Sequence, residues 1–238
     1  MRARKKTRTA VLITGAAAVL LLVACAPADE PTGDGSLNVR IAGTITREVY
    51  ENGGGSGSVS GPSFDIVEPP FQMRDFDIDP EHKVLVFLVS SGMETPVAVG
   101  TQGNESFSFV VTTGNPAELV RVHHLPNTGP EPESDDPDAR FDEVRIFVDR
   151  EDFHIQPEWE LTFGALVDGG YEFVTTRYIY ADRSTTVSGG YFGEGVQLAE
   201  GWNVLYSTYQ GSLGHVSSIV AEKPADANLE WVVYRLPM

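Results

Sequence analysis

The sequence predicts an all-β protein built as an antiparallel β-sandwich. Short segments in which apolar and polar residues alternate recur along the chain, which is the period of a strand with one buried face. Clusters of Gly, Pro, Asp and Ser separate them, and no window of helical length shows a clean 3.6-residue period. Strands with buried faces must stack as two sheets or close on themselves, so a β-barrel is the alternative.

Three strands are predicted in the first half of the chain. Apolar and polar residues alternate over residues 37–45. Residues 83–89 (KVLVFLV) are apolar on both faces and should lie centrally in a sheet, whereas residues 106–111 alternate Ser with Phe before two valines. β-Branched and aromatic residues pack well on a pleated surface, so both segments favour strands over helices. Residues 53–61 (GGGSGSVSG) are predicted to form a loop.

Six further strands are predicted in the second half. They span residues 144–148, 160–167, 172–180, 203–209, 216–221 and 229–235. Asp168, Gly169 and Gly170 lie between two apolar alternations and signal a hairpin. Short connections of this kind favour antiparallel pairing. Trp202 and Trp231 are expected to pack between sheets, although aromatic side chains could also form a platform for sugars or peptides.

Residues 126–139 (PNTGPEPESDDPDA) form an acidic segment without a large apolar residue. Such a segment either links two small β-sandwich domains or is a long loop of one domain. No internal repeat relates the two halves of the chain, so we expect a single β-sandwich domain over residues 37–238 with an acidic loop at 126–139.

Two acidic clusters are candidate calcium sites. Asp75, Asp77 and Asp79 have the spacing that begins an EF-hand loop, but a proline replaces the required glycine and a valine stands in place of the bidentate glutamate. Strand alternation offers another interpretation, in which Phe76 and Ile78 face inward and the three aspartates face water.

The acidic loop supplies the second candidate, with Asp135, Asp136 and Asp138 as oxygen ligands. Flexible acidic loops usually remain solvated, so the expectation is that the chain needs no cofactor, with calcium as the only alternative.

Recognisable catalytic patterns are absent from the sequence. The G-x-S-x-G turn of many serine hydrolases does not occur. None of the histidines has the i, i+2 or i, i+4 spacing that commonly supplies two zinc ligands, and His123 and His124 should point to opposite faces of a strand. Paired carboxylates cannot be identified by spacing, which leaves a hydrolase using carboxylates as an alternative.

The N-terminal segment has the pattern of an export signal. Basic residues at positions 2–8 precede the uncharged apolar run 10–24. This run is shorter than the roughly 20 residues that a membrane-spanning helix needs.

The residues that follow, Leu22-Val23-Ala24-Cys25, resemble the lipobox of bacterial lipoproteins. The resemblance implies removal of the signal peptide 1–24 and acylation of Cys25, palmitate being one such acyl group, with residues 25–36 as a flexible tether. More than one acyl chain holds a protein stably on a membrane. The expected location is the cell membrane or outer membrane, with the domain facing the periplasm or the exterior.

The chain is strongly acidic, with a formal net charge of −17. This charge argues against nucleic acid as a partner and against docking on anionic lipid by charge. We therefore expect a lipid-anchored protein of the cell envelope, a non-catalytic binding or structural module for a protein or carbohydrate ligand. The alternatives are an envelope hydrolase that uses carboxylates and a calcium-stabilised module similar to adhesins.

Overall fold

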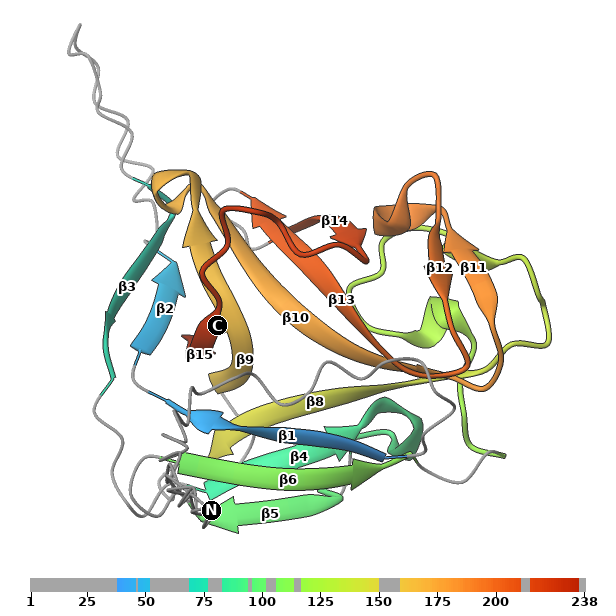
Figure 1. Ribbon diagram of the computed structural model, residues 1–238, viewed down its shortest axis with the longest axis horizontal. Coiled ribbons are helices and arrows are strands. Elements are labelled where there is room, and N and C mark those ends of the chain that lie inside the picture. Colours follow the sequence, from blue (N-terminus) through green and yellow to red (C-terminus); the bar gives the residue numbers. More distant parts are fainter. Residues whose placement is uncertain are drawn as a thin grey trace, which may run out of the picture.

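The computed structural model describes most of the chain beyond its N-terminal segment. The described residues are 38–45, 47–51, 69–76, 83–93, 96–101, 106–113, 117–149, 159–210 and 215–235. They form strands and four short 3₁₀ helices, without an α-helix among them (Figure 1). The prediction of an all-β protein is therefore confirmed. Within these residues, no helix has the length and apolar character needed to cross a membrane.

All nine predicted strands are found, with ends that differ by a few residues. The strands are β1 (Asn38–Thr44), β2 (Arg47–Glu51), β3 (Phe71–Asp75), β4 (Lys83–Leu88), β5 (Ala98–Thr101), β6 (Ser106–Thr112), β7 (Glu133–Ser134), β8 (Phe141–Asp149), β9 (Trp159–Val167), β10 (Glu172–Ala181), β11 (Thr185–Ser188), β12 (Val196–Leu198), β13 (Gly201–Gln210), β14 (His215–Val220) and β15 (Glu230–Arg235). The 3₁₀ helices are η1 (Val89–Ser91), η2 (Val122–His124), η3 (Asp168–Gly170) and η4 (Gly190–Phe192). Sequence reasoning missed β2, β3, β5, β7, β11 and β12, which are short or lack clear alternation.

The largest sheet has the strand order β14-β13-β10-β8-β9-β15-β2-β3, and β4 joins β5 to β8. Figure 1 shows it curling, with β2 and β3 on one side, β10 and β13 on the other and β8 below. Pairing is antiparallel except between β15 and β2, which are parallel. This departure from the predicted antiparallel pairing joins strands from opposite ends of the chain, where no tight turn imposes a direction.

The predicted hairpin at residues 168–170 is confirmed. Helix η3 connects β9 to β10, and these two strands pair antiparallel. Asp168, Gly169 and Gly170 all have positive φ angles. A Cβ atom on Gly170 would lie 2.6 Å from the carbonyl oxygen of Phe71, so glycine is required there both by conformation and by space.

Two smaller sheets flank the curled sheet. Strands β1 and β6 pair with each other, and their inward side chains, including Val39 and Phe109, share a hydrophobic cluster with Val84 of β4 and Ile146 of β8. The third sheet, β12-β11-β7, contains part of the predicted acidic loop. Its apolar side chains join a second cluster that includes Phe141, at the start of β8.

The predicted burial of Trp202 and Trp231 is confirmed, at 1% and 6% exposure. The indole nitrogen of Trp231 donates a hydrogen bond to the carbonyl oxygen of Ala42, 3.0 Å away. Its ring lies directly over Gly43, where a Cβ atom would approach within 2.0 Å. Both tryptophan side chains therefore pack inside the protein.

Candidate functional site

Three strands of the curled sheet diverge around an opening. Strand β10 pairs with β9 over Glu172–Thr175 and with β8 over Tyr178–Ala181. Strands β8 and β9 pair only at Phe147 and Val148. The backbone hydrogen bonds between the strands are therefore interrupted between these three pairings. We call this place the strand junction. Side-chain contacts connect the strands there.

Two arginine–glutamate pairs bridge the diverging strands at the junction. Arg177 of β10 donates two hydrogen bonds to Glu143 of β8, at 2.9 and 2.6 Å. Arg145 of β8 likewise donates to Glu160 of β9, at 2.6 and 2.7 Å. The Arg177 and Glu143 side chains are only 6% and 4% exposed. Two-point arginine–carboxylate pairs fix geometry as well as charge, so they hold strands together where backbone hydrogen bonds are missing.

Arg177 also holds a segment that covers this part of the sheet. Its guanidinium donates to the carbonyl oxygens of Pro126 and Asn127, at 2.8 and 3.2 Å. Further along the segment, the carbonyl oxygen of Thr128 accepts a hydrogen bond from the backbone nitrogen of Tyr191. Gly190 makes this approach possible, because a Cβ atom there would lie 2.2 Å from that oxygen. The start of the acidic loop is thus firmly packed.

The cavity at the junction is small. Its volume is about 30 Å³, room for about two water molecules. All four charged side chains of the two ion pairs line it. Burial disfavours the charged form of Arg145, but the Glu160 carboxylate favours it more strongly. The pKa of Arg145 is therefore raised.

Two tyrosines border the same cavity. Burial raises the pKa of Tyr178 to about 12. Burial, together with the negative charge of Glu160, also raises the pKa of Tyr209 to about 12. Both hydroxyls therefore stay neutral over the ordinary pH range.

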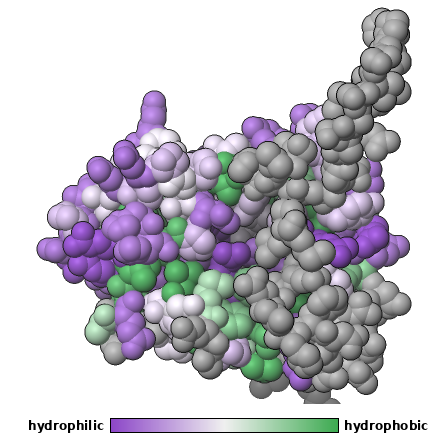
Figure 2. Space-filling model, turned by 180° about the vertical axis from the view of Figure 1, so that it is seen from behind, coloured by the Kyte–Doolittle hydropathy of each residue, from purple (hydrophilic) through white to green (hydrophobic). Residues whose placement is uncertain are grey.

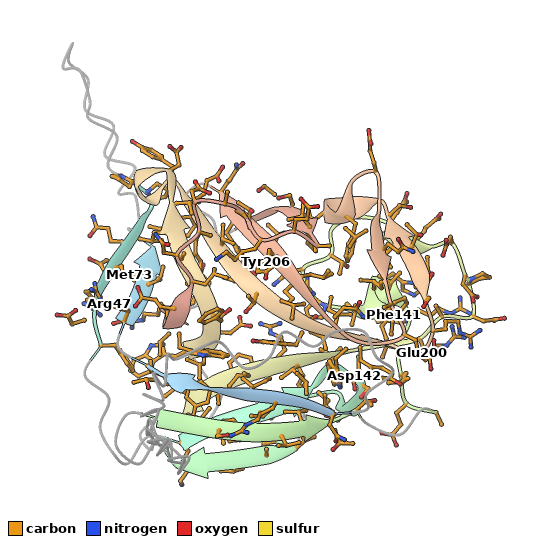
Figure 3. The ribbon with its side chains drawn as sticks, viewed as in Figure 1. Arg47, Met73, Phe141, Asp142, Glu200 and Tyr206 are labelled. Atoms are coloured by element: carbon orange, nitrogen blue, oxygen red, sulfur yellow. The ribbon has the colours of Figure 1, made fainter. Side chains whose placement is uncertain are left out.

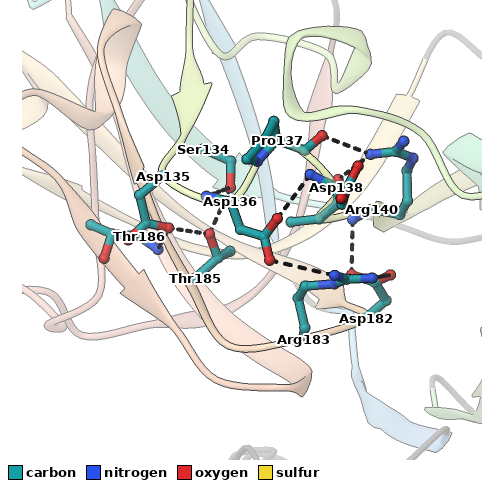
Figure 4. Close-up of polar contacts among 11 residues, drawn as sticks. Ser134, Asp135, Asp136, Pro137, Asp138, Arg140, Asp182, Arg183, Thr185 and Thr186 are labelled. Atoms are coloured by element: carbon teal, nitrogen blue, oxygen red, sulfur yellow. Dashed lines mark hydrogen bonds and ion pairs between the residues drawn. The ribbon is translucent and has the colours of Figure 1, made fainter.

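The predicted acidic loop is ordered by its own carboxylates (Figure 4). Asp135 accepts hydrogen bonds from the hydroxyl of Thr185, at 2.5 Å, and from the backbone nitrogen of Thr186, at 2.8 Å. These bonds lower the pKa of Asp135. Asp136 accepts from the backbone nitrogen of Asp138 at 2.9 Å, which closes a tight turn.

Arginines on the neighbouring turn and loop complete this surface network. Arg183 lies 3.4 Å from Asp136 and 3.2 Å from Asp182. Arg140 donates to the carbonyl oxygens of Pro137 and Ala139. In Figure 2, seen from behind, the end of the molecule that bears this network is strongly hydrophilic.

A surface pocket lies against the acidic loop. Its volume is about 330 Å³, within the range of small-ligand pockets. The lining comes from the segment around η2, from the loop and from the start of β8. The lining residues are Arg121, Val122, His123, Pro132, Glu133, Ser134, Asp136, Pro137, Ala139 and Phe141.

Three of the carboxylates predicted as calcium ligands, those of Asp75, Asp135 and Asp136, contact other groups of the protein. No group of His, Cys, Asp or Glu that could hold a metal is found in the part of the chain that the structure describes. Asp75 is exposed and lies 3.5 Å from Arg47. Asp77 and Asp79 lie outside the described residues. As alternation predicted, Phe76 packs inward, with its ring against Trp159.

Two further sequence predictions concern the adjacent histidines and the acylation site. His123 and His124 do not lie on opposite faces of a strand. They belong to η2, and their rings are in contact, with centroids 4.1 Å apart and planes tilted by 52°. That prediction was wrong because a 3₁₀ turn, unlike a strand, can bring adjacent side chains together. Cys25, the predicted lipidation site, lies outside the described residues, as do the signal peptide and tether.

Sequence reasoning missed the strand junction. Arg145 and Arg177 alternate with apolar residues and therefore look like solvent-facing positions of half-buried strands. Their pairing with Glu143 and Glu160 depends on the divergence of the strands, which no pattern in the sequence predicts.

Comparison with protein-family models, with curated proteins and with solved structures finds no match to this chain.

Proposed function

We propose that the protein is a lipid-anchored protein of the cell envelope whose β domain is a non-catalytic binding or structural module. The observation that carries this proposal is the contrast between its two candidate sites. Glu143 and Glu160 are paired with arginines around a cavity of about 30 Å³, whereas a pocket of about 330 Å³ opens at the surface. A binding role uses the second kind of site.

The state of the buried carboxylates supports the non-catalytic part of the proposal. A general acid or base must reach the proton that it transfers. Glu143 and Glu160 each accept two hydrogen bonds from an arginine. Asp142, labelled in Figure 3, accepts hydrogen bonds from the backbone nitrogen and the hydroxyl of Ser90. These contacts give all three carboxylates a role in holding the fold.

The arrangement of the sheets as a β-sandwich is also part of our proposal. We describe the domain as a β-sandwich in which β1 and β6 cover β4 and β8. The packing of Val39 and Phe109 against Val84 and Ile146 supports this description.

Attachment is tested by replacing the predicted acylation site. Cys25→Ser removes the thiol that would carry the acyl chains, so the protein should move from the membrane fraction to the soluble fraction of the envelope. Fractionation, with high-salt washes to remove proteins held by charge, measures this change. Ala28→Ser, a substitution of similar size in the tether, should leave the protein in the membrane fraction. Retention of the Cys25→Ser variant would refute the lipid anchor.

A further inference from the structure

The layer formed by β1, β4, β5 and β6 differs in charge from the rest of the domain. These four strands contain Arg40 and Lys83 but no aspartate or glutamate, in a chain with 34 acidic residues and a net charge of −17. Figure 1 shows them together at the bottom of the molecule, with β5 and β6 side by side. The acidic residues therefore lie outside the strands of this layer.

The same layer carries exposed apolar side chains. Val110 of β6 is 64% exposed, and Val97 and Val99, next to and within β5, are 47% and 57% exposed. Figure 2, seen from behind, shows apolar residues gathered in the lower half of the molecule. Apolar patches that a soluble domain leaves uncovered are typical of surfaces that contact a partner or a membrane.

The outward side of β1 and β6, which we call the β1–β6 face, combines the two features. Arg40 and Val110 lie opposite each other in the antiparallel pairing, so their side chains point to the same side of the sheet. Arg40 is exposed and has no ion-pair partner among the described residues. The neighbouring outward residues Ser108 and Thr112 are neutral and exposed. A cation thus stands beside an apolar group on a face that is otherwise uncharged.

The predicted tether brings this face near the membrane. Residues 26–37 separate Cys25 from Asn38, where β1 begins. A flexible tether of this length spans about 20 Å on average, whereas a domain of about 200 residues is about 40 Å across. Strand β1 is therefore held closer to the bilayer than the far side of the domain.

We propose that the β1–β6 face docks on the anionic phospholipid headgroups of the membrane that holds the acyl chains of Cys25. Arg40 contacts headgroup phosphates, and Val110 lies against the interface. One cation attracts an anionic surface only weakly, and the tether makes the contact effective by keeping the face close to the membrane. The same headgroups repel the acidic faces of the domain and turn them outward. This inference rests on the proposed lipid anchor and adds an orientation to it.

The docked face is mapped with a fluorophore on an introduced cysteine. Because acylation blocks Cys25, the only cysteine of the chain, Ser108→Cys on β6 supplies a single free thiol. Gln197→Cys on β12, which lies far from β6 in Figure 1, is the matched control position. The acylated protein is purified from membranes and reconstituted in vesicles of phosphatidylcholine and phosphatidylglycerol. Sedimentation with the vesicles measures attachment. A quencher on the lipid headgroups should then quench the probe at position 108 about 3-fold more strongly than the probe at position 197, because the width of the domain separates the two positions.

The contribution of charge is tested with Arg40→Gln. The matched control is Arg121→Gln, which removes an exposed arginine outside this layer. One basic residue near an anionic surface changes the ratio of docked to undocked protein about 5-fold. Quenching at position 108 should therefore fall in Arg40→Gln and in vesicles without phosphatidylglycerol, and should be unchanged in Arg121→Gln.

Two kinds of failure are distinguishable. Equal quenching at positions 108 and 197, or equal effects of the two arginine substitutions, would overturn the docking face and leave the anchor intact. Failure of the protein to sediment with the vesicles would overturn the anchor and the docking face together.

Discussion

Arg177 and Arg183 both contact acidic side chains, but Arg177 lies at the strand junction inside the sheet, whereas Arg183 lies at the surface beside the acidic loop. The Arg177 side chain is 6% exposed and the Arg183 side chain 45% exposed. Arg177 donates to Glu143 and to two backbone carbonyls, while Arg183 reaches two aspartates at longer distances. Similar chemistry thus occurs in two very different dielectric surroundings.

This difference shows where ion pairs contribute most to the stability of the fold. A buried ion pair is costly to break, because removing one partner leaves an uncompensated charge away from water. Ion pairs at the surface are screened by solvent and contribute little. The junction should therefore respond strongly to substitution, and the acidic loop weakly.

The largest expected effect is from Arg177→Met. This change leaves Glu143 buried without its partner, so the free energy of unfolding should fall by about 3–5 kcal/mol. Urea denaturation followed by tryptophan fluorescence measures it. Arg183→Met is the matched surface control and should leave the denaturation midpoint nearly unchanged. A second substitution, Glu143→Leu, should restore much of the stability that Arg177→Met removes. Equal effects of the two arginine substitutions would show that burial does not distinguish the two regions.

An intermediate effect is expected at alkaline pH. The folded protein keeps Tyr178 and Tyr209 neutral up to a pKa of about 12, whereas tyrosines of the unfolded chain ionise near pH 10. The stabilisation is therefore complete below about pH 10 and is lost as the pH rises towards 12. Ultraviolet absorbance should show a late tyrosinate phase that shrinks in Tyr178→Phe and Tyr209→Phe. Titration of all tyrosines in one phase near pH 10 would contradict the burial of these hydroxyls.

The smallest expected effect is from Asp135→Asn in the acidic loop. Hydrogen bonds from Thr185 and Thr186 lower the pKa of Asp135 in the folded protein, so its contribution is present above about pH 4. It is lost as the pH falls through the lowered pKa of the folded state. Thermal unfolding should show a small loss of stability at neutral pH that disappears in strong acid. A difference that does not depend on pH would indicate that the carboxylate charge plays no part.

The fold could be predicted from the sequence where local pattern and final environment agree. Residues 83–89 are apolar on both faces, and β4 lies between β5 and β8 as that pattern requires. The turn at 168–170 likewise combines residues that adopt positive φ with two alternating neighbours. Local chemistry decides both features, so one sequence is enough to find them.

The candidate sites could not be predicted, because they depend on contacts between distant segments. Glu143 and Arg177 meet across a pairing of β8 with β10 that begins only at Tyr178. Asp135 was correctly recognised as part of an acidic loop, but its partners Thr185 and Thr186 lie about fifty residues away. The sequence indicates neither which charged side chains are buried nor which carboxylates already accept hydrogen bonds from other residues.

The parallel pairing of β15 with β2 has a consequence for the time course of folding. Among the described residues, β2 and β3 join the large sheet through β15, which comes much later in the sequence. During synthesis from the N-terminus, β2 therefore emerges long before the strand with which it pairs. Closing so long a loop is slow, because its entropy is lost before any contact compensates for it. Strands β2 and β3 cannot join the sheet until β15 is available, which makes their addition a late event.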